Sequence, residues 1–518
     1  MCRSNELNMN ILAQCCERFS LDVIANLKEQ CGWEPIVVIS GLEVESLSAS
    51  LFPNALYMDS FDAIRGKYPP LKTGPCEPLS EDLLNEMAQH EALILKMMDR
   101  MDPLKIFTYQ ERERLYHRHL KFWNAFFNSY QVDLAFYPVI PHMVFDYVAY
   151  LMAKKRGIST LILNRPAFRG HVFIQNDIDT LPLKLKNTYD ELLTSGKIED
   201  LSPRAHAYLQ SLRKPANHSA QVHWQHRGVS YSTGQNKAAH AITRQFRKQC
   251  NRLLAGGIRI AKGTRKQNPS RIYHKVPGRQ IEEVDPLDTI HSRMRKKGKK
   301  ELSKLIALYS SLCTEPPKKP YVFAALSYQP EQNTSPQAGQ FVHQYLMIEL
   351  LAHALPEGWE LYVKEHPATL HLDKKKGECS RDTWFYLDIA SLPRTSLAPL
   401  DSNTIALVDE SRCVATATGT VGWEALVRGK PVLVFGHSWY EYCKGIFRIM
   451  NVKQCSHVLE EIASGYTVNH HLTDMYMLAI EKYGVRGFNY DSHAKSAHID
   501  SATNIKNIVA VIRKHLNI

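Results

Sequence analysis

The chain has 518 residues and a formal net charge of +12, and 44% of its residues are hydrophobic and 22% charged. This composition excludes a fibrous or wholly disordered chain, and the length predicts two or three domains. The longest mainly apolar stretch, residues 345–355, falls far short of the roughly 20 residues that span a bilayer. A transmembrane helix is therefore not expected.

The first 170 residues alternate strand-like and helix-like stretches. Helical spacing of apolar residues extends over 81–100 and 110–130, and an apolar helix is expected from Pro141 to Lys155. The intervening apolar runs predict strands at 35–41, 133–137 and 160–163. Strand, helix and strand in this order predict a parallel sheet covered by helices.

The middle of the chain is polar and strongly basic. Residues 213–300 contain 21 Lys and Arg against 4 Asp and Glu, so the remainder of the protein is slightly acidic. Such a segment typically contacts phosphate, as in nucleic acid, anionic lipid or an anionic substrate. A solvated insertion between two domains is an equally good interpretation.

A second α/β pattern begins after Pro316-Pro317. The expected strands are 321–326, 361–363, 413–417 and 431–435, and the expected helices are 338–354, 402–410 and 420–428. Residues 472–518 have a helical pattern and can pack back across either domain. We therefore predict a fold with two Rossmann-like domains and a basic, mainly helical or loop-like insertion between them. The predicted boundaries are 1–200, 201–315, 316–470 and 471–518.

Three polar segments follow predicted strands of the second domain, where ligands of open α/β sheets bind. In the first, Gln329 and Glu331 offer donors and acceptors to a hydroxyl-rich ligand, although a polar turn explains them equally well. In the second, Lys364 and His366 share one face of an extended chain, which suits a phosphate or carboxylate.

The third segment, residues 417–424, is a small glycine-containing turn between a strand and a helix. The free N–H groups at that helix end can hold a phosphate, and Thr418, Gly419 and Thr420 add hydroxyls and close backbone approach. Glu424 lies one turn into the helix, where it can accept hydrogen bonds from ribose. The structural alternatives are N-capping by Thr420 and dipole complementarity by Glu424.

Three stretches of the second domain resemble a known family. YVFAALSYQPEQNT, LPEGWELYVKEHP and VATATGTVGWEALVRGKPVLVFGHSWY look like the bacterial capsule polysaccharide biosynthesis family, which includes Kdo transferases. The resemblance implies a GT-B-like glycosyltransferase, with two Rossmann-like domains facing across a cleft and the nucleotide sugar on the C-terminal one. The His-Pro pair is also similar to the CMP-binding motifs of bacterial sialyltransferases.

The resemblance implies a role for each of these residues. His366 would stabilise the departing CMP phosphate, the turn from Thr418 to Thr420 would hold the same phosphate, and Glu424 would hold the ribose. Gln329 and Glu331, with Lys364, would line the sugar-nucleotide pocket. The implied reaction moves a Kdo-like acidic sugar from a CMP donor to a glycan or glycolipid, and it needs neither a metal nor a cofactor.

The first domain offers candidates from across the implied cleft. His142 follows a strand, and Asp146 lies four residues on along the same helix face, so the pair can act as a general base and its orienting carboxylate. Arg165 can bind an acidic acceptor or the sugar carboxylate. A capping or core histidine and a surface arginine are the structural alternatives. Asp177 and Asp179 match a metal-binding DxD pattern, but three residues are a weak signal.

Several alternatives remain open at this point. A UDP- or GDP-sugar transferase, a sugar-nucleotide epimerase or a noncatalytic partner in capsule assembly fits the same fold. Nucleic-acid binding by residues 213–300 would leave the second-domain site unexplained, and no nucleic-acid partner is expected. Eleven scattered cysteines and an N-terminus without an apolar signal core favour a cytoplasmic protein. The basic segment could then rest on the anionic inner surface of the membrane.

Overall fold

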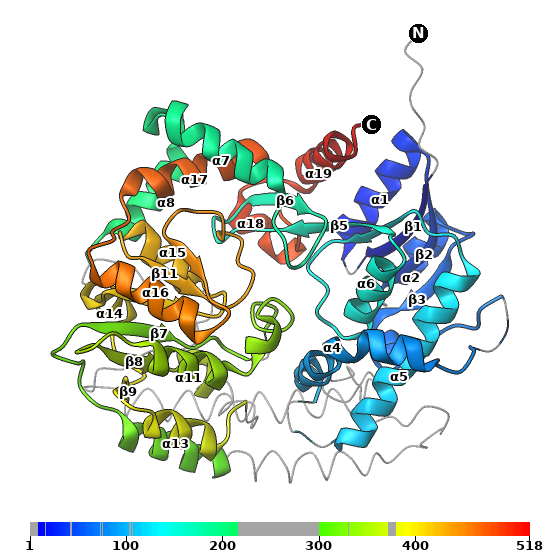
Figure 1. Ribbon diagram of the computed structural model, residues 1–518. Coiled ribbons are helices and arrows are strands. Elements are labelled where there is room, and N and C mark those ends of the chain that lie inside the picture. Colours follow the sequence, from blue (N-terminus) through cyan, green and yellow to red (C-terminus); the bar gives the residue numbers. More distant parts are fainter. Residues whose placement is uncertain are drawn as a thin grey trace, which may run out of the picture.

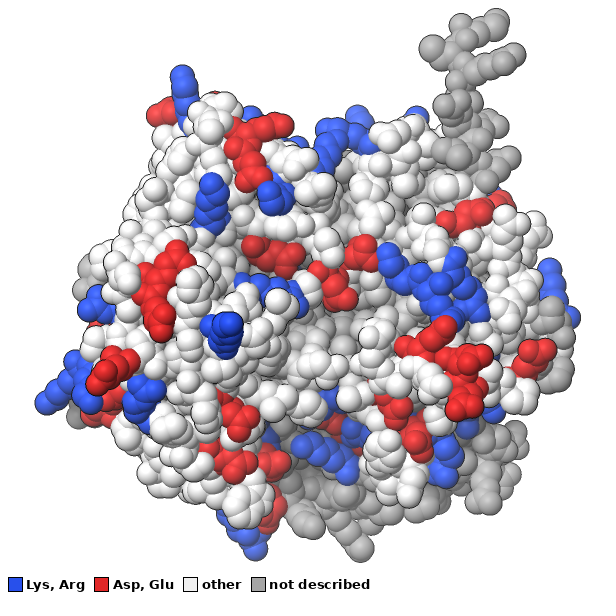
Figure 2. All heavy atoms as spheres, viewed as in Figure 1, with Lys and Arg blue, Asp and Glu red and all other residues white. Residues whose placement is uncertain are grey.

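Two α/β domains make up the fold, each built on its own twisted sheet. Figure 1 shows the computed structural model, which describes residues 9–518 except 16, 42–43, 73, 75, 103–104, 106, 216–299, 330 and 371–379. The N-terminal domain lies on the right of the view and the C-terminal domain on the left. The molecular surface is hollowed where the two domains meet (Figure 2). The expected pair of Rossmann-like domains is confirmed.

The N-terminal sheet has the strand order β13-β6-β5-β4-β1-β2-β3. The pairs from β5 to β3 are parallel, whereas β6 pairs antiparallel with both β5 and β13. The bounds of these strands are β1 (Met9–Cys15), β2 (Trp33–Ser40), β3 (Leu56–Asp59), β4 (Leu134–Tyr137), β5 (Ser159–Asn164), β6 (His171–Gln175) and β13 (Val485–Arg486).

Helices cover both faces of this sheet. One apolar cluster joins the sheet to α1 and α19, and another joins it to α4, α5 and α6. The helix bounds are α1 (Arg18–Cys31), α2 (Glu45–Leu51), α3 (Ser60–Ile64), α4 (Glu81–Met97), α5 (Tyr109–Ser129), α6 (Phe145–Lys155), α18 (Ala494–Ala497) and α19 (Ser501–Leu516). Because both faces are buried, strands such as β4 and β6 consist entirely of buried residues.

The C-terminal sheet is parallel throughout, in the order β12-β11-β10-β7-β8-β9. Its strands are short, and the four inner ones are almost wholly buried, as expected for a sheet between two helical layers, whereas the edge strands β9 and β12 are partly exposed. Their bounds are β7 (Tyr321–Ala325), β8 (Glu360–Lys364), β9 (Thr395–Leu397), β10 (Cys413–Thr416), β11 (Val432–Val434) and β12 (Ile446–Arg448).

Two helical layers cover this second sheet. Helices α11 (Gln344–Ala354), α13 (Thr383–Ser391) and α16 (Val452–Ala463), with helical residues 300–312, share one apolar cluster. The other face carries α14 (Thr404–Glu410), α15 (Thr420–Val427), α17 (His470–Tyr483), α7 (Leu183–Ser195) and α8 (Pro203–Arg213).

The packing corrects the predicted domain boundaries. Helices α7 and α8, expected in or just after the N-terminal domain, contribute buried side chains to the core of the C-terminal domain. The helix at 300–312 also belongs to that core, although we expected it in the linker. Residues 485–518 cross back, because β13 pairs with β6 and α19 packs on α1. Chain order alone does not reveal which sheet a surface helix covers.

Most predicted elements of regular structure are present within two to four residues of their expected ends. Strands β1, β3, β6, β9, β12 and β13 were not expected, since they are short or interrupted by polar residues. Nearly all of the basic segment 213–300 lies outside the described residues, so its expected contact with a membrane stays a prediction. Among the helices that the structure describes, none combines the length and apolar character needed to cross a membrane.

Candidate functional site

The three segments singled out by sequence meet at one edge of the C-terminal sheet. Strand β7 lies between β10 and β8, with Ala325 paired to Thr416 on one side and to Lys364 on the other. The residues that follow these three strands therefore emerge side by side at the carboxyl edge. This is the ligand-binding position of open parallel sheets.

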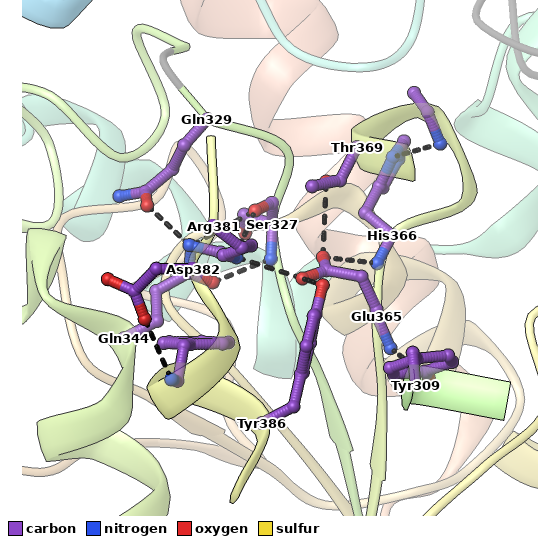
Figure 3. A network of polar contacts seen from close by, with 12 residues as sticks. Tyr309, Ser327, Gln329, Gln344, Glu365, His366, Thr369, Arg381, Asp382 and Tyr386 are labelled. Atoms are coloured by element: carbon purple, nitrogen blue, oxygen red, sulfur yellow. Dashed lines mark hydrogen bonds and ion pairs between the residues drawn. The ribbon is translucent and has the colours of Figure 1, made fainter. Parts of the chain in front are cut away.

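A buried carboxylate organises the end of β8 (Figure 3). Glu365 is fully buried, and its Oε1 accepts hydrogen bonds from His366 N at 2.7 Å and Thr369 Oγ1 at 3.1 Å. Its Oε2 accepts from Arg381 Nε at 2.8 Å and from Tyr386 Oη at 2.9 Å. Four donors and one opposite charge satisfy the carboxylate, as a buried charge requires.

Arg381 extends this network to the end of β7. Its Nη1 donates to Gln329 Oε1 at 2.5 Å and its Nη2 to Ser327 O at 3.2 Å, while the guanidinium lies 4.4 Å from the ring centroid of Phe385. Gln344 from α11 makes two further bonds to the backbone of Ser327. The turns after β7 and β8 are thus fixed as one rigid unit.

His366 is held by both its backbone and its ring. Its Nδ1 accepts a hydrogen bond of 3.2 Å from Ala368 N, at the start of the helical residues 367–370. Because Nδ1 acts as an acceptor, the ring proton lies on Nε2. The ring centroid lies 6.2 Å from that of Tyr328, which follows β7. The imidazole is therefore oriented at the junction of the two strand ends, with a donor on Nε2.

Lys364 lies in the sheet beside this histidine, with little exposure. Burial lowers the pKa of its ammonium to about 8, while Glu365 and Asp401 act in the opposite direction. Within the part of the chain that the structure describes, the ammonium has no ion-pair partner. A buried cation of this kind attracts an anion at the same edge of the sheet.

The turn between β10 and α15 presents a helix N-terminus. Gly419, rather than Thr420, is the N-cap, and no side chain caps the first turn. A Cβ atom at Gly419 would lie 2.8 Å from Thr416 Oγ1, so only glycine fits. Thr418 is buried and its hydroxyl donates to Asn333 O, which joins this turn to the loop after β7. The arrangement suits an anion because the positive end of the helix dipole lies uncapped.

Glu424 lies one turn into α15 and is half-buried. Burial raises the pKa of its carboxyl to about 7, with Arg428 opposing. Its charge also contributes to the raised pKa of Tyr208, whose main cause is burial. The carboxylate forms no hydrogen bond with the residues that the structure describes. The carboxylate is therefore available to a ligand. With a pKa of about 7, it changes its charge near neutral pH.

The remaining predicted residues of this domain have different surroundings. Gln329 is buried and committed to the protein, because its Nε2 donates to Val342 O and its Oε1 accepts from Arg381. Glu331, by contrast, is partly exposed in the loop after β7. The expected direct contact of Gln329 with a sugar nucleotide has no support in this geometry.

In the N-terminal domain, the predicted pairing of His142 with Asp146 is wrong. His142 Nδ1 lies 2.6 Å from Ile140 O, and burial lowers the pKa of the ring to about 3. The Asp146 carboxylate instead accepts from Met143 N at 2.7 Å and Gln14 Nε2 at 3.2 Å. Asp146 therefore holds the backbone at the start of α6, including that of His142, whereas the imidazole itself lies against Ile140 O.

Arg165 and the two acidic residues of the DxD pattern lie in the N-terminal domain. Arg165 is exposed directly after β5, and partial burial of its guanidinium lowers its pKa. Asp177 contacts Lys154 and Tyr150 within its own domain. Asp179 has 72% of its side chain exposed and lies 4.0 Å from His437 of the C-terminal domain. The two carboxylates thus have separate partners.

Sequence reasoning missed the residues that support the site. Glu365 was placed on the face opposite to His366 without a role, and Arg381 and Tyr386 were not considered. The available signal was the charged residue between Lys364 and His366, just after the predicted buried strand 361–363, because a charge near a buried strand end needs a partner. Among the described residues, no group of three or more His, Cys, Asp or Glu side chains is arranged to hold a metal ion.

Comparison with known proteins supports the resemblance seen in the sequence. Residues 334–458 match the family model described as capsule polysaccharide biosynthesis protein. This segment of the C-terminal domain is similar to that family, and it makes up about a quarter of the chain. It contains His366, the turn at 418–420 and Glu424, so the family match and the carboxyl edge of the sheet coincide.

Individual relatives are more distant. The capsule polysaccharide modification protein LipA of Neisseria meningitidis serogroup B is 30% identical over 95 residues, which are 18% of this chain and 12% of LipA. The chain thus matches only a small part of that relative's length.

Solved structures give similarities of fold at low scores. KpsC of Thermosulfurimonas dismutans matches as a β-Kdo 2,4 transferase, with 11% identity, 69% of this chain and 82% of that chain covered and a TM-score of 0.29. A putative UDP-N-acetylglucosamine 2-epimerase of Listeria monocytogenes matches with 12% identity, coverage of 98% and 97%, and a TM-score of 0.23. Scores of this size do not distinguish a transferase from an epimerase.

Proposed function

We propose that the protein is a glycosyltransferase of capsule polysaccharide synthesis that uses a CMP-linked, Kdo-like acidic sugar. The observation that carries the proposal is the meeting of His366, the N-terminus of α15 and Glu424 at one sheet edge, within the segment that matches the family. The acceptor would be a surface glycan or glycolipid.

The C-terminal domain would bind the donor and stabilise the leaving group. When the bond between the sugar and CMP breaks, negative charge develops on the phosphate. His366 Nε2–H, the first-turn N–H groups of α15 and the Lys364 ammonium can donate to that charge without rearrangement, because the Glu365 network already fixes the turn after β8. Glu424 would accept hydrogen bonds from the ribose hydroxyls.

The N-terminal domain would supply the carboxylate that acts on the sugar or the acceptor. We assign this role to Asp179 in place of His142, because Asp179 is exposed at the domain junction and His142 has a strongly lowered pKa. A carboxylate in this position can serve as a base toward the acceptor or as a nucleophile toward the sugar.

The proposal also covers the cofactors, the cellular location and the partners of the protein. The reaction as proposed uses no cofactor and no metal, since a CMP-linked sugar already has a good leaving group. The protein would work in the cytoplasm, at the inner face of the membrane, where lipid-linked acceptors lie. Residues 213–300 would contact anionic lipids there, and other capsule-assembly proteins are possible partners.

Calorimetric titration of the full chain with CMP, UDP and GDP tests the proposal. We expect selective binding of CMP that is lost in His366→Ala and kept in His353→Ala, a change of an exposed histidine on α11. Selective binding of UDP would instead favour an epimerase or another transferase, and it would refute the proposal of a CMP-linked donor. The absence of binding by all three nucleotides would favour a noncatalytic partner in capsule assembly.

A further inference from the structure

The loop between β5 and β6 lies in a group of positive charges, which, among the described residues, only Glu331 and Glu481 offset from nearby. Arg165 and Arg169 belong to this loop, and Arg204 from α8 and Arg486 from β13 lie next to it. None of the four forms an ion pair with a residue that the structure describes. Like charges held close together raise the free energy of the protein unless an anion joins them.

The loop is fixed before any ligand arrives. Asn164 Oδ1 accepts from Arg165 N at 2.8 Å, and Asn164 Nδ2 donates to Gln175 Oε1 at 2.8 Å. The Arg204 guanidinium lies 4.2 Å from the Phe168 ring centroid, and its Nη1 donates to Arg169 O at 2.7 Å. Arg204 is therefore a positioning residue that holds the backbone of the loop at Arg169.

The C-terminal segment completes this group. His493 lies with both ring nitrogens within 3.2 Å of Arg165 Nη1, and the Tyr490 ring centroid is 5.8 Å from the same guanidinium. Burial lowers the pKa of His493 to about 4, and the charges of Arg165 and Arg169 add to this effect. Asn489 is buried beside the ends of β4 and β5, and its Oδ1 has no hydrogen-bond partner among the described residues.

This group faces the donor side of the junction. The charge of Glu331, in the loop after β7, acts on Arg165, and the charge of Arg169 acts on Tyr208. Tyr208 is in turn influenced by Glu424 of α15. Arg165 directly follows β5, at the carboxyl edge of the parallel part of the N-terminal sheet, which is the edge where ligands of such sheets bind.

We propose that Arg165 and Arg169, completed by His493, bind an anionic group of the donor, either the carboxylate of the acidic sugar or the phosphate of the nucleotide. The inference rests on the proposed function for the identity of the donor. The carboxylate is the favoured source, because the N-terminus of α15, Lys364 and His366 already supply the phosphate with donors from the C-terminal domain. Two arginines then select an acidic over a neutral sugar by charge-assisted hydrogen bonds.

The test uses the full chain and two ligands, free Kdo and CMP. Binding of Kdo is followed by thermal shift with glucose as the neutral control, and binding of CMP by calorimetry. The variants are Arg165→Gln combined with Arg169→Gln, the milder Arg169→Lys, and Arg114→Gln as a matched change of an exposed arginine on α5. Circular dichroism checks that each variant folds.

We expect the double variant to bind Kdo at least about tenfold more weakly, the usual effect of losing a charge-assisted hydrogen bond, and to bind CMP within about twofold of the wild type. Arg169→Lys should lie between the double variant and the wild type, and Arg114→Gln should match the wild type. A loss confined to CMP would assign the arginines to the phosphate.

Unchanged affinity for both ligands in the double variant would overturn the inference, as would a wild-type protein that binds neither of them. If the wild type binds no nucleotide but its response to Kdo depends on the arginines, the proposed CMP-donor function fails and the anion site stands.

Discussion

Replacement of Arg381 by methionine tests whether the buried network at the end of β8 organises the site. The guanidinium is almost fully buried and bonds to Glu365, Gln329 and the backbone of Ser327. Methionine fills most of the same volume without the charge. The change therefore removes three hydrogen bonds and leaves the Glu365 carboxylate buried without its counter-ion.

The expected cost follows from that geometry. Removing one partner of a buried ion pair typically costs about 3–5 kcal/mol, because the remaining charge stays desolvated. Three donors from His366, Thr369 and Tyr386 still contact Glu365, which favours the lower half of that range. For a domain of this size a loss of about 3–4 kcal/mol lowers the melting temperature by roughly 6–16 °C. We also expect CMP to bind at least about tenfold more weakly, since the turn at His366 loses its support.

Scanning calorimetry of the full chain measures the stability, and titration with CMP measures the binding. Arg412→Met is the matched control, because Arg412 is exposed in the same domain and its replacement should change stability by about 0.5 kcal/mol or less. Combining Arg381→Met with Glu365→Gln should cost less than the sum of the single changes by about 2 kcal/mol. If Arg381→Met unfolds at the same temperature as Arg412→Met, the network does not support the site and our reasoning fails.

Three further predictions concern the site itself. His366→Ala should abolish transfer. It should cost only about 1 kcal/mol of folding stability, the usual value of a lost helix cap, because His366 Nδ1 accepts a hydrogen bond from Ala368 N. Retained turnover in a transfer assay would contradict the role of His366 at the phosphate. The pKa of the Glu424 carboxyl is raised to about 7, so the folded state binds this proton more tightly than the unfolded chain does. The stabilisation that comes from the protonated carboxyl therefore falls as pH rises from about 4.5 to 7. Between about pH 6 and pH 8 the CMP affinity should rise, because the carboxylate ionises there, and Glu424→Gln should remove both trends in calorimetry repeated at each pH. Asp179→Asn should lower turnover more than about 100-fold with CMP binding unchanged, whereas Asp177→Asn should keep turnover within a few-fold of the wild type. Equal effects of the two changes would refute the assignment of the catalytic carboxylate to Asp179.

The sequence by itself determined the class of fold and the sheet edge at which the candidate site residues gather. Buried apolar runs such as 321–326 and 413–417, each followed by a polar turn, were sufficient to predict parallel strands with a ligand edge. The family resemblance added His366 and the turn at 418–420. The inference of the fold succeeded because hydrophobic periodicity is a local property, and the segments meet because the ends of adjacent parallel strands share one edge of the sheet. The roles of the residues at that edge stay predictions.

Only the tertiary structure decided which polar groups face a ligand and which support the protein. Gln329 was expected to contact the donor but is committed to Arg381, a residue 52 positions away. Asp146 was expected to orient His142 but instead bonds to Gln14 of β1. The arginines of the β5–β6 loop meet His493 only because residues 485–518 cross back to the first sheet. Such partnerships depend on the packing of distant segments, because burial makes a hydrogen bond or a counter-ion obligatory wherever the fold brings a polar group inside.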